Sequence, residues 1–296
     1  MFVVKYRKFW FILSGLLLTL SFWFMYSYGF NLSIDFKGGT ITEVKYAESR
    51  PAQSDIESKI ATLNLGGVSV RPSGATNYAI RTRELSAEER QKLSEVLGNP
   101  VVERQNTIGP VAGAELQSKA VKAIGVVVLM IVLFVTFAFR RVSKPVASWK
   151  YGLATIIALA HDVIIPTGVF VYLGHVMGFE IDLLFVTGLL AVLGYSVHDT
   201  IVVFDRVREN LSVNQETNHK EDFELTVGKS VEQTFARSIN TSLTIFITLL
   251  ALYIYGSGAT AHFALLLIVG LIAGTYSSIF VASPLLVTFS KWQKRA

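Results

Sequence analysis

Long apolar runs alternate with short charged segments along most of the 296-residue chain. Several of these runs are about twenty residues long, the length that an α-helix needs to cross the hydrocarbon core of a bilayer. They predict six transmembrane helices, over residues 9–28, 120–139, 151–173, 181–203, 237–255 and 262–286. The chain is therefore predicted to be an α-helical polytopic membrane protein.

Residues 34–109, between the first two apolar runs, carry the shorter patterns of a soluble domain. Strand-like stretches occupy 40–47, 68–71, 78–82 and 101–108, and helix-like stretches occupy 54–63 and the residues after Ser86. Ser54 is expected to cap the first helix, and Ser86 with Glu89 has the spacing of a capping box. The order β-α-β-β-α-β is the split βαβ arrangement, which predicts a ferredoxin-like α+β sandwich.

The distribution of charge gives the topology. Only 17% of the residues are charged and 51% are hydrophobic, whereas about a quarter are charged in ordinary soluble domains. Lys and Arg gather in residues 1–8, 140–150 and 204–236 and in the tail, while 174–180 and 256–261 contain neither. Because cytoplasmic loops carry the basic excess, both termini are predicted to be cytoplasmic and the soluble domain extracytoplasmic. The net charge of +5 is assigned to these loops rather than to nucleic-acid binding.

Three parts are expected. Residues 1–30 form the cytoplasmic N-terminus and transmembrane helix 1, residues 31–118 an extracytoplasmic ferredoxin-like domain, and residues 119–296 helices 2–6 with a cytoplasmic segment at 204–236. The first run is about twenty residues long and no small-x-small site follows it, so it is predicted to be a retained helix rather than a signal peptide. Within the cytoplasmic segment, the polar stretch Ser212–Asp222 is predicted to be loose.

One carboxylate lies inside an apolar run, where a charge costs a few kcal/mol or more. Asp199 comes four residues before Val203, roughly 6 Å along the axis from the predicted cytoplasmic end of its helix. Arg237 opens the fifth run from the same side, so the two are expected at similar depth, either paired or sharing a water-filled crevice. The polar side chains on the same helix faces are Tyr195, Ser196, Asn240 and Thr241. Two interpretations stay open: a protonatable site with a hydrogen-bonded proton path, or a structural ion pair at the membrane edge.

A second acidic group, Asp162, follows His161 inside the third run. It lies eleven residues into the predicted helix, roughly 16 Å deep and close to the bilayer centre. Such a carboxylate must face the bundle interior or be protonated. It is either part of a proton path or a satisfied interhelical hydrogen bond. His198, beside Asp199, points about 100° away from it and is assigned to packing.

Small residues and prolines mark helix contacts. Gly270 and Gly274 form a GxxxG motif, and Ser277 and Ser278 continue the small face, which favours close helix packing within this chain or against another. Pro166 and Pro284 are expected to kink their helices or to be tolerated within them.

The motifs of several enzyme classes are absent or incomplete. There is no cysteine, which excludes disulfides, thiolate metal sites and Cys nucleophiles. No GxxxxGK[ST] sequence is present, so a P-loop ATPase is excluded. The serine-protease-like Gly194-Tyr195-Ser196 lacks the final Gly, and neither Asp162 nor Asp199 has a GxGD context. No enzyme activity, cofactor or metal is therefore expected, and energy must come from an ion gradient or a partner.

Four motifs in order resemble the SecF family of the resistance-nodulation-division superfamily. They are Ile34-Asp35-Phe36-Lys37-Gly38-Gly39, His161-Asp162, the stretch GYSVHDTIVVFDRVREN at 194–210, and Arg237-Ser238-Ile239-Asn240-Thr241-Ser242. The resemblance covers nearly the whole chain. Ser238 stands where the family often has Thr, a departure expected to lie outside the proton path. The resemblance is to a lone SecF and not to a fused SecDF.

The resemblance implies an accessory subunit of the bacterial Sec translocase in the inner membrane, driven by the proton motive force. SecD, the SecYEG channel and unfolded preproteins are the implied partners, with YajC and YidC as further ones, and no nucleic acid. Asp199 and Arg237 match the family's membrane carboxylate and arginine in the proton path, and the main partner carboxylate is expected on SecD. Two alternatives are a small-molecule or lipid exporter of the same superfamily and a purely structural membrane scaffold. The exporters usually carry two large outer loops and twelve helices in one chain.

Overall fold

The computed structural model describes residues 2–47, 51–66, 68–73, 76–140, 147–219, 221–256 and 258–293. Five of the Lys and Arg residues counted in the basic segments above lie outside these ranges: Arg141, Lys144, Lys220, Lys294 and Arg295.

Six helical runs among the described residues are long and apolar enough to cross a membrane, which confirms the predicted class. Five are single helices: α2 (Arg7–Tyr28), α6 (Pro110–Ala138), α7 (Ser148–Met177), α8 (Leu183–Glu216) and α9 (Phe223–Tyr255). The sixth is α10 (Ala259–Ser277), continued by a π-helical turn η1 (Ser278–Ala282) and by α11 (Ser283–Gln293). Short helices α1 (Phe2–Lys5) and α3 (Ile34–Lys37) flank α2. The runs exceed their predicted bounds because the apolar pattern marks only the part of a helix suited to lipid.

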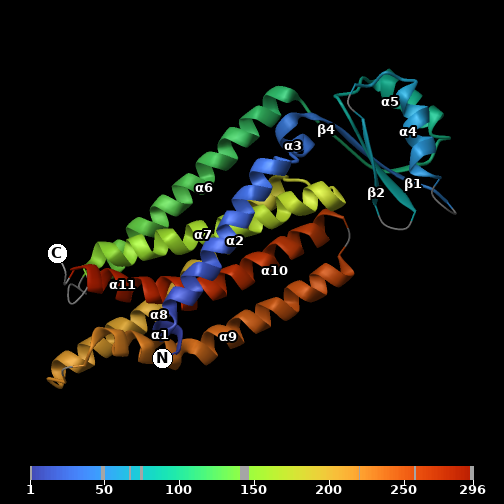
Figure 1. Ribbon diagram of the computed structural model, residues 1–296. Coiled ribbons are helices and arrows are strands. Elements are labelled where there is room, and N and C mark those ends of the chain that lie inside the picture. The colour runs from blue at the N-terminus through green and yellow to red at the C-terminus, as the bar shows by residue number, and fades with distance from the viewer. Residues whose placement is uncertain are drawn as a thin grey trace.

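The sheet and its two helices lie at one end of the helical bundle, and both chain ends lie at the other (Figure 1). The apolar windows of α7, α8 and the α10–η1–α11 run are 44%, 39% and 67% buried, whereas those of α2, α6 and α9 are 11%, 6% and 11% buried. The first three therefore form the inside of the bundle, and α9 leaves most of its surface open.

The predicted ferredoxin-like sandwich is present. Strands β1 (Gly39–Lys45), β2 (Ser69–Ser73), β3 (Asn77–Thr82) and β4 (Val101–Ile108) form one sheet in the order β2-β3-β1-β4, with every neighbouring pair antiparallel. Helices α4 (Gln53–Ala61) and α5 (Ala87–Val96) cover one face. These elements are called the sheet domain below. Its core consists of Val44, Ile56, Ile60, Leu65, Val70, Tyr78, Ile80, Leu85, Leu93 and Leu97.

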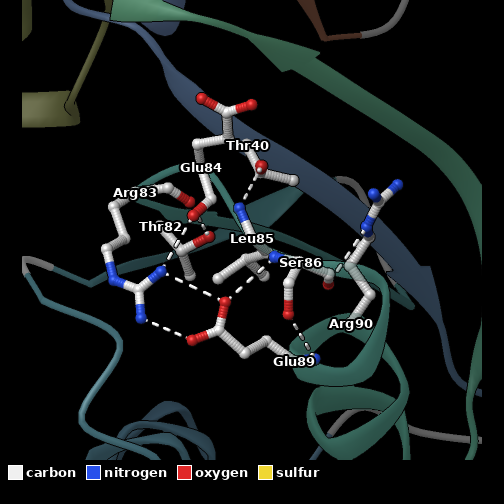
Figure 2. A network of polar contacts seen from close by, with 8 residues as sticks. All are labelled: Thr40, Thr82, Arg83, Glu84, Leu85, Ser86, Glu89 and Arg90. Carbon is white, nitrogen blue, oxygen red and sulfur yellow. Dashed lines mark hydrogen bonds and ion pairs between the residues drawn. The ribbon is translucent and has the colours of Figure 1, made fainter.

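The two helix caps of the sheet domain had different outcomes. The capping box is confirmed, because the Ser86 hydroxyl accepts from the Glu89 amide and the Glu89 carboxylate accepts from the Ser86 amide. Arg83 binds the same carboxylate at 2.5 Å (Figure 2), and this hydrogen bond lowers the pKa of Glu89 to about 2. The predicted cap Ser54 is wrong: α4 starts one residue earlier, after Ala52, which offers no side-chain cap.

The polar stretch Ser212–Asp222 is more ordered than predicted. Helix α8 continues to Glu216, and only 217–222 separate it from α9 among the described residues. Side-chain bonds support this last turn, since the Ser212 hydroxyl donates to Glu216 at 3.0 Å and the Asn214 amide donates to Thr226 of α9 at 3.3 Å. Composition favoured a loose segment, but these local and interhelical bonds stabilise a helix.

The GxxxG motif packs α10 against α8 within this chain. A Cβ on Gly270 would run into the Val192 side chain, and one on Gly274 would lie 3.0 Å from the Ser196 Cβ. Of the two prolines, Pro166 lies inside the single helix α7. Pro284 is the second residue of α11, which begins right after the π turn η1, and its missing N–H interrupts the α-helical ladder there.

Candidate functional site

A fully buried carboxylate joins three helices at the centre of the bundle. Asp162 of α7 is 0% exposed. Its Oδ1 lies 2.9 Å from Nδ1 of His161. Its Oδ2 accepts from the hydroxyls of Ser277 in α10, at 2.7 Å, and of Ser196 in α8. A buried charge must be paired or hydrogen-bonded, and three donors from three helices meet this requirement for an ionised Asp162.

His161 extends this cluster towards α2. It is 2% exposed, and its ring stacks on Tyr276 with centroids 5.6 Å apart. The Tyr276 hydroxyl bonds to Ser14 at 3.1 Å and donates to the Trp10 carbonyl at 2.9 Å, both on α2. The Nε2 atom of His161 is buried without a hydrogen-bond partner among the described residues. The pair His161–Asp162 can therefore hold a proton that the surrounding helices shield from lipid.

A second row of hydroxyls continues from the same face of α8. Thr200 bonds to Ser278 at 2.8 Å, and the Ser278 hydroxyl lies 3.3 Å from the Ser196 carbonyl oxygen. Ser278 begins the π turn, and Ser283 donates back to its carbonyl at 2.9 Å. The wider turn thus lies directly beside the buried carboxylate cluster, a position where π turns are often functional.

Asp199 of α8 contacts α9. It is midway along the helix, 16 residues after Leu183, because α8 extends well beyond the predicted Val203. Its Oδ1 accepts from the Ser238 hydroxyl of α9 at 2.6 Å. Its Oδ2 is buried and has no hydrogen-bond partner among the described residues. Among the described residues, one oxygen of the Asp199 carboxylate is therefore hydrogen-bonded and the other is not.

Arg237 does not bind Asp199 within this chain. Both residues are described, and no ion pair joins them. The Arg237 side chain is instead exposed on the outer surface of α9, next to the buried Ser238. Ser238, expected to lie outside the path, donates its hydroxyl to Asp199 and so contacts a candidate path residue.

Polar side chains form an exposed stripe along α9: Arg237, Asn240, Thr241, Thr244 and Thr248. Thr244 and Thr248 donate to carbonyls of their own helix, at 2.8 and 3.1 Å. Such bonds let a hydroxyl face an apolar medium. A guanidinium facing lipid costs several kcal/mol, so Arg237 in particular needs a polar neighbour that this chain does not supply among its described residues.

The structure thus divides the predicted path residues into groups. His161, Asp162 and Ser196 form the buried cluster, and Asp199 lies apart with Ser238. Tyr195 donates to the Leu267 carbonyl at 3.0 Å and faces α10. Arg237, Asn240 and Thr241 lie on the open stripe. The residues not predicted as path residues are Thr200, Ser238, Ser277 and Ser278; the sequence analysis named Ser277 and Ser278 only as small residues of a packing face.

Metal binding has no evident place in this arrangement. Across the described ranges, no three His, Cys, Asp or Glu side chains gather closely enough to hold an ion. The chemistry that the two carboxylates support is the uptake and release of protons inside a helical bundle.

Fold and site together define a multi-span membrane protein with a ferredoxin-like domain and with buried carboxylates between its helices. Residues 89–292 match the family model of the protein export membrane protein SecD/SecF, C-terminal, and residues 23–49 match the SecD/SecF GG motif. The protein translocase subunit SecF of Thermobaculum terrenum is 39% identical, over 97% of this chain and 93% of that protein. SecF of Synechocystis sp. is 33% identical, over 98% and 94%. The chain belongs to the SecF family.

A solved relative shows the same architecture. The crystal structure of SecDF, a translocon-associated membrane protein from Thermus thermophilus, matches with a TM-score of 0.82 at 32% identity. The match covers 99% of this chain and 38% of the SecDF chain. A second SecDF structure, in a super-membrane-facing form, matches 100% of this chain and 39% of its own with a TM-score of 0.67.

Proposed function

We propose that this chain is an accessory subunit of a Sec protein translocase that works with SecD and uses proton flow to promote preprotein export. The names of the relatives, protein translocase subunit SecF and SecDF, support the class of process. The observation that carries the proton coupling is the free Oδ2 of Asp199 beside the exposed polar stripe of α9.

Protonation of Asp199 changes what holds α8 to α9. As a carboxylate, Asp199 accepts from Ser238 and attracts cationic groups nearby, among them Arg237 of α9. As a neutral acid it loses that attraction. A group whose charge changes inside a bundle can shift the balance between two packings of the same helices. In this proposal, protonation of Asp199 shifts the packing of α8 against α9.

The site is incomplete in this chain, and SecD is proposed to complete it. Arg237 and Asn240 face outward from α9, where SecD helices carrying the partner carboxylate would cover them. In this proposal SecYEG and an unfolded preprotein are further partners, and YajC and YidC join the assembly. The setting is the bacterial inner membrane, with both termini cytoplasmic and residues 31–118 on the outer side.

Asp162 is proposed as a second proton-binding group on the same path. It is linked to Asp199 through α8, because Ser196, which donates to Asp162, lies three residues before Asp199 on that helix. A proton on Asp162 would remove one acceptor from the α7–α8–α10 contact. His161 is the adjacent base that could exchange the proton.

Two alternatives remain as competing functions. A small-molecule or lipid exporter would have to select its cargo through the bundle, yet the inner helices are joined by short hydrogen bonds around Asp162. A structural scaffold needs the carboxylates only for helix register. The names of the relatives favour protein translocation over both.

The test is preprotein export into inverted membrane vesicles that contain SecD and either wild-type chain or Asp199→Asn. The Asn keeps the size of the side chain and cannot titrate. Asp205→Asn is the matched control, because Asp205 lies on the same helix with its side chain 52% exposed and paired to Arg208. We expect proton-driven export to fall at least tenfold with Asp199→Asn only. Equal export by both variants would refute the proposal.

A further inference from the structure

A charged cavity separates the open face of the sheet from the ends of α7, α8 and α10. Its volume is about 590 Å³. The sheet contributes Arg71, Arg81 and Arg104, with Glu43, and the opposite wall contributes Asp35, Glu180 and Asp182. The sheet side is therefore mainly basic and the helix-end side acidic, so the two walls attract each other across the cavity.

One ion pair crosses this cavity. Arg81 of β3 binds Glu180, which lies between α7 and α8, and their side chains are 23% and 10% exposed. Arg81 follows Ile80, a core residue on the helix-covered face of the sheet, so strand alternation turns Arg81 towards the membrane bundle. Burial and the neighbouring Arg71 lower the pKa of Arg81 to about 10. Arg81 still carries its charge at neutral pH.

The segment that carries Glu180 is fixed from both sides. Ile181 forms a short parallel bridge with Leu32, through bonds of 3.0 Å from the Ser33 amide and 2.9 Å to the Asn31 carbonyl. Glu180 therefore cannot move independently of the chain that links α2 to the sheet domain. Its contact with Arg81 adds a direct connection to β3.

The first turn of α8 is held by two carboxylates. Asp35 accepts from the Leu183 amide at 3.0 Å, and Asp182 accepts from the Phe185 amide at 2.7 Å. Carboxylates satisfy the free amides of a helix N-terminus and interact favourably with its dipole. Asp35 belongs to α3, immediately before the sheet domain, so it joins that domain to the start of α8.

Helix α8 connects this region to the proton site. Asp199 lies 16 residues after Leu183, about 24 Å along an α-helix. Hydrogen bonds from Ser196 to Asp162 and from Ser238 to Asp199 act on the middle of the same helix. A packed helix moves as a unit, so a shift imposed at Asp199 is carried to its N-terminal turn.

We propose that the Arg81–Glu180 ion pair, together with Asp35 on the first turn of α8, transmits movement of α8 to the sheet domain. Arg81 and Glu180 are positioning residues in this scheme. The biological role of this linkage rests on the proposed function. The linkage adds a prediction that the proposed function does not contain: without the ion pair, protons still pass Asp199 but no longer drive export.

The test uses the complex with SecD in vesicles and measures proton flow and preprotein export together. Arg81→Glu and Glu180→Arg each place like charges in contact, and the double variant restores opposite charges. We expect each single variant to lose export at least about fivefold, the low end for coupling between sites, with proton flow within twofold of wild type. The double variant is expected to regain most export. The same charge reversals at Lys45 and Glu103, an exposed ion pair of the same domain at 3.2 Å, are expected to change neither proton flow nor export.

Three results would overturn the linkage: normal export in both single variants, no recovery in the double variant, or loss of proton flow in parallel with export. Misfolding is detected independently, because the chain has no native Cys. Arg81→Cys combined with Glu180→Cys is expected to be joined by a short bismaleimide cross-linker in the folded complex, because two side chains as long as Arg and Glu meet across a gap too wide for a direct disulfide; no cross-link would also refute the contact. If Asp199→Asn left export and proton flow intact, the proposed function would fail, while the cross-linking result would still stand.

Discussion

The hydroxyl of Ser238 on α9 donates a 2.6 Å hydrogen bond to Oδ1 of Asp199 on α8. The neighbouring Arg237 is exposed on α9 and forms no ion pair with that carboxylate. Adjacent residues of α9 thus have different roles: Ser238 holds the Asp199 carboxylate, and the charge of Arg237 is available to another partner. Oδ2 of Asp199 stays without a hydrogen-bond partner among the described residues, which suits it to exchange a proton.

Ser238→Ala is expected to reduce proton flow through the complex about tenfold. Hydrogen bonds to charged groups contribute about 1.5–3 kcal/mol, and this one orients Asp199. Ser238→Thr keeps the hydroxyl and is expected to retain near-normal flow. Flow measured in vesicles under an imposed pH gradient distinguishes the two. If Ala and Thr behaved alike, the bond to Asp199 would have no role in proton transfer.

Asp162→Ala is expected to destabilise the bundle by about 3 kcal/mol or more, because it leaves buried donors on three helices without their acceptor. The measurement is thermal or denaturant unfolding in detergent. Asp205→Ala serves as control, since Asp205 is exposed on α8, and is expected to stay within about 0.5 kcal/mol of wild type. Similar losses in the two variants would show that the Asp162 cluster does not hold the helices together.

Local patterns predicted much of this fold. The six spans follow from apolar length alone, and the Ser86–Glu89 capping box is confirmed because all its donors and acceptors lie within four residues of sequence. The strand order β2-β3-β1-β4 follows from the β-α-β-β-α-β order. In contrast, Ser54 has the right residue type for a cap but lies inside α4, since helix starts are among the least certain boundaries.

The candidate site was less predictable because it depends on which helices are neighbours. Asp162, Ser196 and Ser277 come from three separate helices, and no sequence spacing brings them together. Matched depth suggested that Asp199 meets Arg237. The rotation of α9 about its own axis instead places Ser238 against the Asp199 carboxylate. The sequence signal that could have found Ser238 is its place one residue after Arg237, on the inner face of the same turn.

Gly270→Ala is expected to destabilise the chain by about 1–3 kcal/mol, the usual cost of overpacking. Its new methyl group would collide with Val192 and lie 3.2 Å from the Tyr195 hydroxyl, where α10 crosses α8. Gly125→Ala is the matched control, because a Cβ on that residue of α6 would meet nothing within 4 Å. Unfolding midpoints compare the two. A loss at Gly125 equal to that at Gly270 would contradict the close α8–α10 contact.

The start of α5 is expected to lose stability in acid. The hydrogen bond from Arg83 holds the pKa of Glu89 at about 2, below its usual 4.5. The stabilisation is therefore present above pH 4.5 and is lost as the pH falls towards 2. Amide exchange at 86–90 should accelerate, relative to the intrinsic rate, between pH 4.5 and pH 2. Arg83→Gln should weaken this dependence, and an unchanged pH profile in that variant would contradict the role given to Arg83.

The central claim is that Asp199 is the proton-binding group through which this chain works with SecD. The most direct measurement is proton flow into sealed vesicles that contain the purified complex, after a pH gradient is imposed. We predict that Asp199→Asn reduces flow to the level of vesicles without the complex, while Asp205→Asn flows as wild type does. Flow through Asp199→Asn at the wild-type rate would contradict the account.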